Sequence, residues 1–233
     1  MAAIDEMRAV VAELMASAWT TRQGRIVPEP DALRLGNDAI EFERATVLYA
    51  DLKGSTALVD AKHWQFCAEI YKAFLHCAAT IIRHQGGTIT SYDGDRVMGI
   101  WVGDVQTTPA AIAGLKINYA VQMIVNPALQ RQYPNQPHEV KQVVGIDTSV
   151  VRAARTGVRG GNDIVWVGRA ANYAAKLTEL DLMERTWITD DAFKRLRHEA
   201  KFGGSPAQLM WKPYIWSEKG NLAIHGSTWW WKV

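Results

Sequence analysis

The stretch YADLKGST, residues 49–56, combines a strand, a carboxylate and a glycine turn. It closes an apolar run of β-branched and aromatic residues, which predicts a buried central strand ending at Asp51. A carboxylate there is costly unless a positive charge meets it, and a metal ion is the simplest candidate. The strand is followed by Gly54, Ser55 and Thr56, which open a predicted helix whose free N–H groups suit an anion. A metal beside an anion site indicates a nucleotide phosphate.

A second carboxylate, Asp95, follows in a predicted hairpin. Two short strand patterns flank Asp93-Gly94 in TITSYDGDRVMGIW, residues 88–101, as in a tight turn. If the two strands are neighbours, the carboxylates of Asp51 and Asp95 converge and repel unless a cation lies between them. Mg²⁺ and Mn²⁺ prefer such oxygen ligands, and two of these ions can clamp a displacement at phosphorus. Each motif alone also fits a structural role, but their order favours function.

A third motif, VGRAANYAAKL, covers residues 167–177. Asn172 and Lys176 are four residues apart, so they share one face of a predicted Ala-rich helix. An amide and a cation on one face suit a reacting sugar hydroxyl and the negative charge that develops on phosphate. Taken alone, an ordinary surface Asn and Lys is the simpler interpretation.

The composition describes an ordinary globular chain. Its 233 residues are 48% apolar and 21% charged, and the net charge of +2 is too weak to indicate nucleic acid or a membrane surface. Cys67 and Cys77 lie ten residues apart in one helical pattern and cannot bridge, which favours a reducing cytosol. We find no apolar run of about 18 residues and no basic N-terminal leader, so we expect a cytoplasmic protein without a membrane span.

Helical and strand patterns alternate around one expected sheet, an α/β (α+β) arrangement. We divide the chain into an N-terminal helix and arm (1–43), a catalytic domain (44–200) and a Trp-rich extension (201–233). Helices are predicted over 4–19, 55–87, 107–125, 169–180 and 191–200. Strands are predicted over 45–51, 139–157, 162–168 and 186–190, with two short strands around Asp93-Gly94 within 88–104 and β-structure or an ordered extension over 208–233.

Taken together, the three motifs resemble those of the class III nucleotidyl cyclases, the adenylate and guanylate cyclase family. VLYADLKGST resembles the family's first metal strand, and GGTITSYDGDRVMGIW its glycine pair, strand and second metal aspartate. VGIDTSVV and VWVGRAANYAAKL resemble its later strands and transition-state helix. The similarity runs from about residue 44 to 192 with order and spacing kept.

The resemblance implies a ferredoxin-like core, with a mostly antiparallel sheet flanked by helices, in a head-to-tail homodimer with composite active sites. It implies that Asp51, Asp95 and the backbone carbonyl of Leu52 bind two divalent cations, Mn²⁺ or Mg²⁺. Asn172 and Lys176 would come from the other protomer. The ribose 3′-OH would attack the α-phosphate of a nucleoside triphosphate, releasing pyrophosphate and a 3′,5′-cyclic nucleotide.

Four positions depart from the family pattern or suggest a changed base. Members that use ATP usually have Lys where this chain has Ser91, and Asp or Thr where it has Val165. A pocket without those polar groups loses its preference for ATP. Strand alternation puts Tyr49 on the face of the first metal aspartate, where its hydroxyl could read a base edge, with Arg96 as a second candidate.

The transition-state helix carries one further change. The family's arginine is replaced by Lys176, which keeps the charge but loses the bidentate fork. A slower turnover or a differently held phosphate would follow.

A compact cyclase without the purine-reading residues resembles the pyrimidine cyclases of the Pycsar antiphage system. That resemblance implies conversion of UTP to cyclic UMP, a messenger for a separate effector protein. The preference for UTP over CTP rests on the family alone. The alternatives are a cytidylate cyclase, an adenylate or guanylate cyclase with an altered base pocket, and a nucleotide-binding module without chemistry. An interaction module working through the Trp-rich tail is a further alternative, although we favour packing of that tail.

Overall fold

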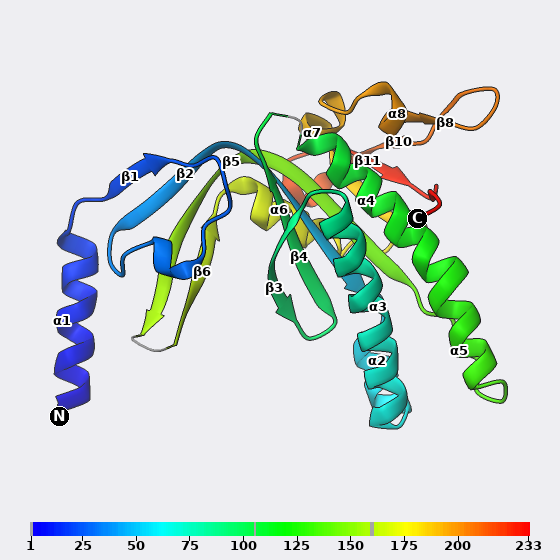
Figure 1. The fold of residues 1–233 in the computed structure, drawn as a ribbon, viewed down its shortest axis with the longest axis horizontal. Helices are drawn as coiled ribbons and strands as arrows, with labels where there is room; N and C mark the ends of the chain where they lie inside the picture. Colours follow the sequence, from blue (N-terminus) through cyan, green and yellow to red (C-terminus); the bar gives the residue numbers. More distant parts are fainter. Residues whose placement is uncertain (1, 105, 159–160) are drawn as a thin grey trace.

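One large mixed sheet carries the fold of this computed structural model, which describes residues 2–104, 106–158 and 161–233. The strand order is β10-β11-β7-β5-β2-β4-β3, with β1 beside β2 and β6 beside β5 (Figure 1). The central pair is antiparallel and long: β2 (Asp38–Leu52) and β5 (Gln142–Val158). The other strands of this sheet are β1 (Thr20–Gln23), β3 (Thr88–Asp93), β4 (Arg96–Val102), β6 (Gly161–Val167), β7 (Thr186–Thr189), β10 (Lys212–Trp216) and β11 (Leu222–Ser227).

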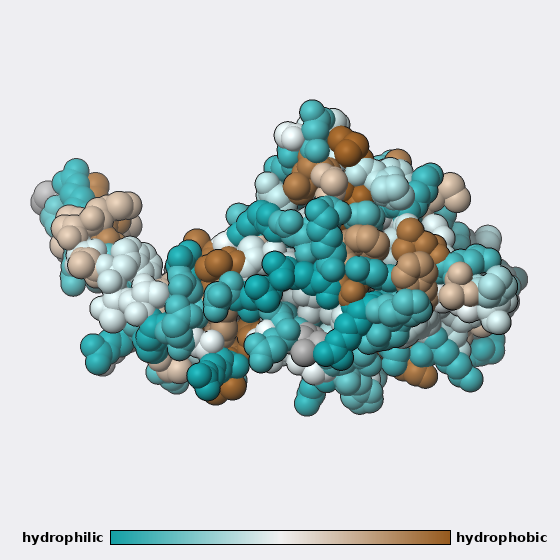
Figure 2. Space-filling view, turned by 90° about the horizontal axis from the view of Figure 1, so that it is seen from above, coloured by the Kyte–Doolittle hydropathy of each residue, from teal (hydrophilic) through white to brown (hydrophobic). Residues whose placement is uncertain are grey.

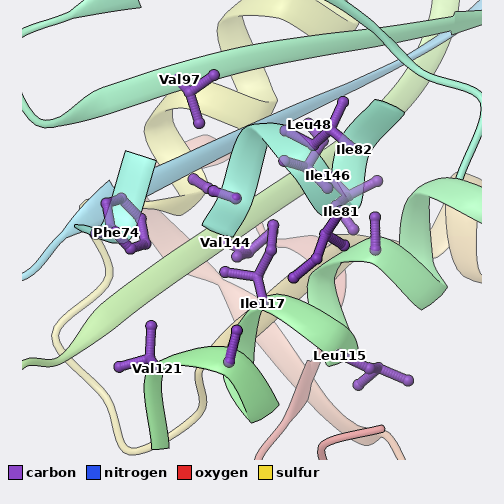
Figure 3. Packing of buried hydrophobic residues seen from close by; sticks show 14 of the residues in the cluster. Leu48, Phe74, Ile81, Ile82, Val97, Leu115, Ile117, Val121, Val144 and Ile146 are labelled. Carbon is purple, nitrogen blue, oxygen red and sulfur yellow. The ribbon is translucent and has the colours of Figure 1, made fainter. Parts of the chain in front are cut away.

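Helices cover both faces of this sheet. The larger core cluster lies between the sheet and two helices, α3 (Trp64–His84) and α4 (Thr107–Ala120), and contains the fully buried Leu48, Ile82 and Leu115 (Figure 3). A second cluster lies on the opposite face under α6 (Arg169–Leu177) and contains Val47, Ile100 and Ala174. Successive residues of β2 therefore enter opposite layers, as strand geometry requires. The expected α/β class with a mostly antiparallel sheet is confirmed, and β5 and β7 form a parallel pair.

Several predicted boundaries were wrong. The central strand begins at Asp38, seven residues before the predicted run. The helix predicted over 55–87 is interrupted by extended backbone at Lys62, which separates α2 (Ser55–Ala61) from α3. The helix predicted over 107–125 has Gln106 as its N-cap and continues through a π-helical turn, η2 (Val121–Val125), into α5 (Asn126–Gln132). The helix predicted over 191–200 is two short ones, α7 (Asp190–Lys194) and α8 (His198–Lys201).

The N-terminal helix α1 (Ala2–Ala16) is present as predicted but projects away from the body, as Figure 1 and Figure 2 both show. Its apolar side chains are exposed, from 43% at Leu14 to 84% at Met15. Asn37 joins it to the arm by donating from Nδ2 to the carbonyls of Leu14 (2.9 Å) and Ser17 (2.6 Å). The arm also contains the short 3₁₀ turn η1 (Pro30–Ala32).

The Trp-rich C-terminal segment is ordered against the body. β10 and β11 extend the main sheet, joined by the 3₁₀ turn η3 (Ser217–Lys219), while β8 (Phe202–Gly203) and β9 (Gln208–Leu209) form a small separate ladder. The N–H of Trp231 donates to the carbonyl of Leu115 in α4, and Asn118 Nδ2 donates to the carbonyl of Trp229. The expected β-structure is therefore present, whereas the division into three domains stays a prediction.

Two expectations from the sequence concern the cysteines and membrane-spanning helices. Cys67 and Cys77 are both free thiols, as their spacing in one helix predicts. Throughout the described ranges, no helix is both long enough and apolar enough to cross a bilayer.

Candidate active site

The candidate residues from β2, β4 and β3 form two cross-strand rows. Residues paired directly across neighbouring strands project to the same face of the sheet. The register places Tyr49, Met98 and Ser91 in one row and Asp51, Arg96 and Asp93 in the next. Met98 and Tyr49 belong to or pack against the second core cluster, so both rows lie on the face that α6 covers. The structure thus brings together four of the predicted site residues: Tyr49, Asp51, Ser91 and Arg96.

Asp51 is a partly buried carboxylate held mainly by Arg96. Arg96 Nε donates to Asp51 Oδ2 at 3.0 Å, and the hydroxyl of Thr178 lies 3.5 Å from the same oxygen. Burial raises the pKa of Asp51 above its ordinary value, the hydrogen bond and charge of Arg96 oppose that rise, and the nearby charge of Asp95 adds to it. The electrostatic influence of Asp95 on Asp51 agrees with the prediction that the two carboxylates converge.

Asp95 lies in the turn of the hairpin, and one of its carboxylate oxygens lacks a hydrogen-bond donor among the described residues. This oxygen, Oδ2, is buried. A buried acceptor left unpaired costs about 1–3 kcal/mol, and more when it is charged. A carboxylate oxygen in this condition, beside a second carboxylate, suits a hard divalent cation.

The donor set fits the two predicted cations without a large acidic cluster. Within the part of the chain that the structure describes, no three His, Cys, Asp or Glu side chains gather as a metal cluster. The remaining ligands would therefore be neutral oxygens or phosphate, which is how Mg²⁺ is usually held. The backbone carbonyl of Leu52, directly after Asp51 on β2, is in sequence position to serve as one of them.

The strand turns into α2 at Gly54, with a left-handed φ of +76° that glycine adopts without strain. Ser55 and Thr56 form the first helical residues, and no side chain caps the helix start. Tyr71 of α3 has a raised pKa, mainly because of burial and also because of the charges of Asp95 and Asp51, while Ser55 opposes the rise. The predicted phosphate loop therefore begins three residues after Asp51, where β2 leads into α2.

Tyr49 and Arg96 form the other side of this patch. The guanidinium carbon of Arg96 lies 5.7 Å from the centroid of the Tyr49 ring. Burial raises the pKa of Tyr49, while Arg96 opposes the rise and Asp93 adds to it. Tyr49 therefore keeps its proton at neutral pH and can both donate and accept a hydrogen bond.

Three predicted site residues lie on α6 and β6. Asn172 and Lys176 are exposed on α6, where Lys176 Nζ pairs with Glu179 at 3.2 Å. Val165 on β6 pairs with Ala154 of β5. The β5 residue opposite Asp51 is Val143, 11 residues away from Ala154. None of the three has a described contact with Asp51 or Asp95.

Sequence reasoning missed Thr178, Tyr71 and Asp93. Thr178 is 127 residues from Asp51 along the chain, and its hydroxyl also donates to the carbonyl of Ala175 at 2.7 Å. No local pattern marks it, because its contact depends on how α6 packs across the sheet. Asp93 was visible only as a turn residue of the hairpin.

Comparison with known proteins gives the family. No family model matches the chain. A curated protein named uridylate cyclase from Burkholderia cepacia is 47% identical over 234 residues, covering 100% of both chains. Another of that name from Xanthomonas perforans is 46% identical over 231 residues, covering 98% of both. The chain belongs to the uridylate cyclase family. Its predicted resemblance to pyrimidine cyclases is confirmed, and as a member of the uridylate cyclase family it is a nucleotidyl cyclase.

Solved structures show that this uridylate cyclase family member has the class III cyclase fold. The guanylyl cyclase Cya2 superposes with a TM-score of 0.67 at 16% identity, covering 81% of this chain and 93% of that one. The adenylyl cyclase CyaB from P. aeruginosa gives 0.64 at 18% identity, covering 82% and 95%. At these identities the likeness concerns the fold alone, and the fold predicted from the motifs is confirmed.

Proposed function

We propose that this protein converts UTP to 3′,5′-cyclic UMP and pyrophosphate. The observation that carries the proposal is the pair of carboxylates, Asp51 and Asp95, with a buried and unpaired Asp95 oxygen, one strand row from Tyr49. The relatives support uridine as the base, since both are named uridylate cyclases and are 46–47% identical over nearly the whole chain.

Asp51, Asp95 and the carbonyl of Leu52 would hold two divalent cations, Mg²⁺ or Mn²⁺. When bound, these ions favour ionisation of the ribose 3′-OH and neutralise the charge that builds on the phosphates. The N–H groups at the turn into α2, with Gly54, Ser55 and Thr56, would hold the triphosphate. The two carboxylates would fix where these cations lie, and positioning of this kind would supply much of the rate.

The base would lie over the two-row patch. The hydroxyl of Tyr49 and the guanidinium of Arg96 offer hydrogen bonds to a pyrimidine edge, and Ser91 presents a short hydroxyl in the same row as Tyr49. Tyr49 also occupies space with a bulky ring, which suits a one-ring base better than a purine. Val165, with its apolar side chain, cannot offer a purine the hydrogen bonds that Asp or Thr would give.

Asn172, Lys176 and Val165 would reach the site from the partner protomer of a head-to-tail homodimer. The exposure of Asn172 and Lys176 on α6 supports this arrangement, because it leaves both side chains open to a partner protomer. In the assembled site Asn172 would orient the ribose, and Lys176 would stabilise the charge that develops on the α-phosphate.

We also propose the setting that the Pycsar resemblance implies. Cyclic UMP would be a second messenger in cytoplasmic antiphage defence and would act on a separate effector protein. Neither nucleic acid nor a membrane would be a partner, in line with the net charge of +2.

The test is a competition experiment. Purified protein is incubated with Mn²⁺ and equal concentrations of the four ribonucleoside triphosphates, and products are identified by mass spectrometry. We expect cyclic UMP as the main product and none after chelation by EDTA. Asp95→Asn, which keeps the shape of the side chain and removes its charge, serves as the inactive control. Cyclic CMP, AMP or GMP as the main product would correct the base, and nucleotide binding without any product would indicate a binding module.

A further inference from the structure

A cavity remote from the candidate active site gathers positive charge. It has a volume of about 260 Å³, and we name it the arginine cavity after its lining residues, which are Arg44, Asp104, Gln106, Thr107, Thr108, Arg195 and Arg197. Arg44 precedes Asp51 by seven residues on β2, which corresponds to about 23 Å along an extended strand. The two sites are therefore separate.

The three arginines come from distant parts of the chain. Arg44 lies in the irregular register between Phe42 and Ala45 of β2, while Arg195 and Arg197 lie between α7 and α8. None of the three forms an ion pair with a described carboxylate, although Asp104 also lines the cavity. Three like charges around one cavity repel one another unless an anion lies between them.

Two buried threonines, Thr107 and Thr108, also line the cavity. Thr108 is only 5% exposed, and its Oγ1 accepts the backbone N–H of Arg197 at 2.9 Å. Among the described residues the hydroxyl hydrogen of Thr108 has no acceptor, and it is in position to be donated to an anion in the cavity. Thr107 and Thr108 also form the first turn of the 14-residue helix α4, which contains no acidic residue there and no side-chain cap. The positive end of that helix favours an anion at the same place.

We propose that the arginine cavity binds the phosphate group of a small phosphorylated molecule. The planar guanidinium fork matches phosphate oxygens in pairs, and the Thr108 hydroxyl supplies a further donor from below. The volume is smaller than the roughly 300–1,000 Å³ of pockets that enclose whole drug-sized ligands. It therefore fits a phosphate or diphosphate group, while any larger part of the molecule remains outside.

The Gln106 side chain shows how the site is tied to the fold. Its Nε2 donates to the carbonyl of Arg44 at 3.3 Å, and it is 4% exposed. Together with the bond from Arg197 to Thr108, it fixes β2 and the α7–α8 segment to the start of α4. The arginine backbones are thus held in place, so binding needs only the side chains to order.

The test is calorimetric titration of the full chain with inorganic phosphate, in EDTA and at constant ionic strength. We expect saturable binding that weakens at least about tenfold in the Arg195→Gln/Arg197→Gln variant. The matched control, Lys72→Gln/Arg83→Gln on α3, removes the same charge elsewhere and keeps the affinity. Both pairs are exposed, and unchanged thermal unfolding will show that the variants fold.

Two outcomes would overturn the proposal. One is equal phosphate affinity in the two double variants. The other is a loss of affinity in Lys176→Gln but not in Arg195→Gln/Arg197→Gln, which would place the phosphate at the candidate active site. Repeating the titration with pyrophosphate and uridine monophosphate separates the sources of the group. Equal affinities indicate a free anion, and tighter binding of the monophosphate that depends on Arg195 and Arg197 indicates a nucleotide.

Discussion

Arg96 contacts both parts of the candidate site, the carboxylate and the proposed base pocket. It donates to Asp51 Oδ2 and places its guanidinium over Tyr49. The charge of Asp51 and its hydrogen bond outweigh the effect of burial on Arg96 and raise the pKa of that guanidinium. A divalent cation bound by Asp51 would balance the negative charge of Asp51 in place of Arg96. Arg96 would then be released toward the base or the phosphates, so metal binding and base recognition would be linked through one side chain.

The Tyr49→Phe variant tests the base-reading role. It removes the hydroxyl but keeps the ring that packs against the second core cluster and contacts Arg96. We expect the preference for UTP over the other triphosphates to fall about tenfold, since one specific hydrogen bond is lost, with the fold retained. The measurement is the product ratio in the four-nucleotide competition. Tyr92→Phe, at a tyrosine that is 57% exposed on β3, is the matched control. An unchanged nucleotide ranking in Tyr49→Phe would remove this residue from the base pocket.

At the scale of elements, α6 and β5 are packed in direct backbone contact. A Cβ atom on Gly145 of β5 would lie 2.1 Å from the carbonyl oxygen of Ala174 and 2.8 Å from Cβ of Leu177. This close approach sets the height of α6 above the sheet. Since α6 carries Asn172 and Lys176 and leads into Thr178, the same contact sets where those side chains lie relative to the carboxylates.

The Gly145→Ala variant is expected to push α6 off the sheet. We expect a loss of about 1–3 kcal/mol in the free energy of unfolding, because the methyl group meets rigid backbone. Cyclase activity should fall further than stability, since the residues on α6 are displaced. Denaturant unfolding and product formation measure the two effects. Gly161→Ala is the control, because among the described residues its Cβ would meet only Val158, at 3.8 Å. Wild-type stability and activity in Gly145→Ala would show that α6 is not held by this contact.

Elements with a strong local pattern were predicted well, and their interruptions were not. The β3–β4 hairpin, β5, β6 and α6 follow from alternation, turn residues and apolar spacing. The break at Lys62 did not, because apolar residues continue on both sides of it and the following helix is held by a contact outside the pattern, from Cys67 Sγ to the carbonyl of Leu58. The candidate site residues likewise divide into those that a local sequence pattern marks and those that only packing brings together.

Asp51 and Asp95 were predictable because one lies at the end of a strand pattern and the other in a hairpin turn, each close to a glycine. Thr178 and Tyr71 were not, because only the packing of helices on the sheet brings them near the carboxylates. Whether Asn172 and Lys176 complete the site is a question about the whole molecule, since one chain leaves them exposed.

At the scale of the assembled molecule, mixing inactive variants tests the composite site. Asp51→Ala and Asn172→Ala should each be inactive alone. In a mixed dimer one of the two sites contains both native residues, so random pairing should restore about a quarter of wild-type activity. Cyclic UMP is measured after the two proteins are co-expressed. Asp51→Ala mixed with Asp95→Ala is the control and should stay inactive, because both changes affect the same half of a site. No recovery in the first mixture would place the whole site within one protomer.

The paired ribbon of β2 and β5 has a consequence for how the molecule can be altered. β2 alone has 15 residues, or about 50 Å of extended chain, and links the arm at one end to Asp51 at the other. Because side chains alternate between the two faces, the length of the ribbon can change without exchanging the faces only in steps of two residues. Adding two residues to each strand would lengthen the reach by about 7 Å and keep every side chain on its own face, whereas adding one would turn the faces over. Natural or engineered changes in the span between arm and carboxylate should therefore come in even steps.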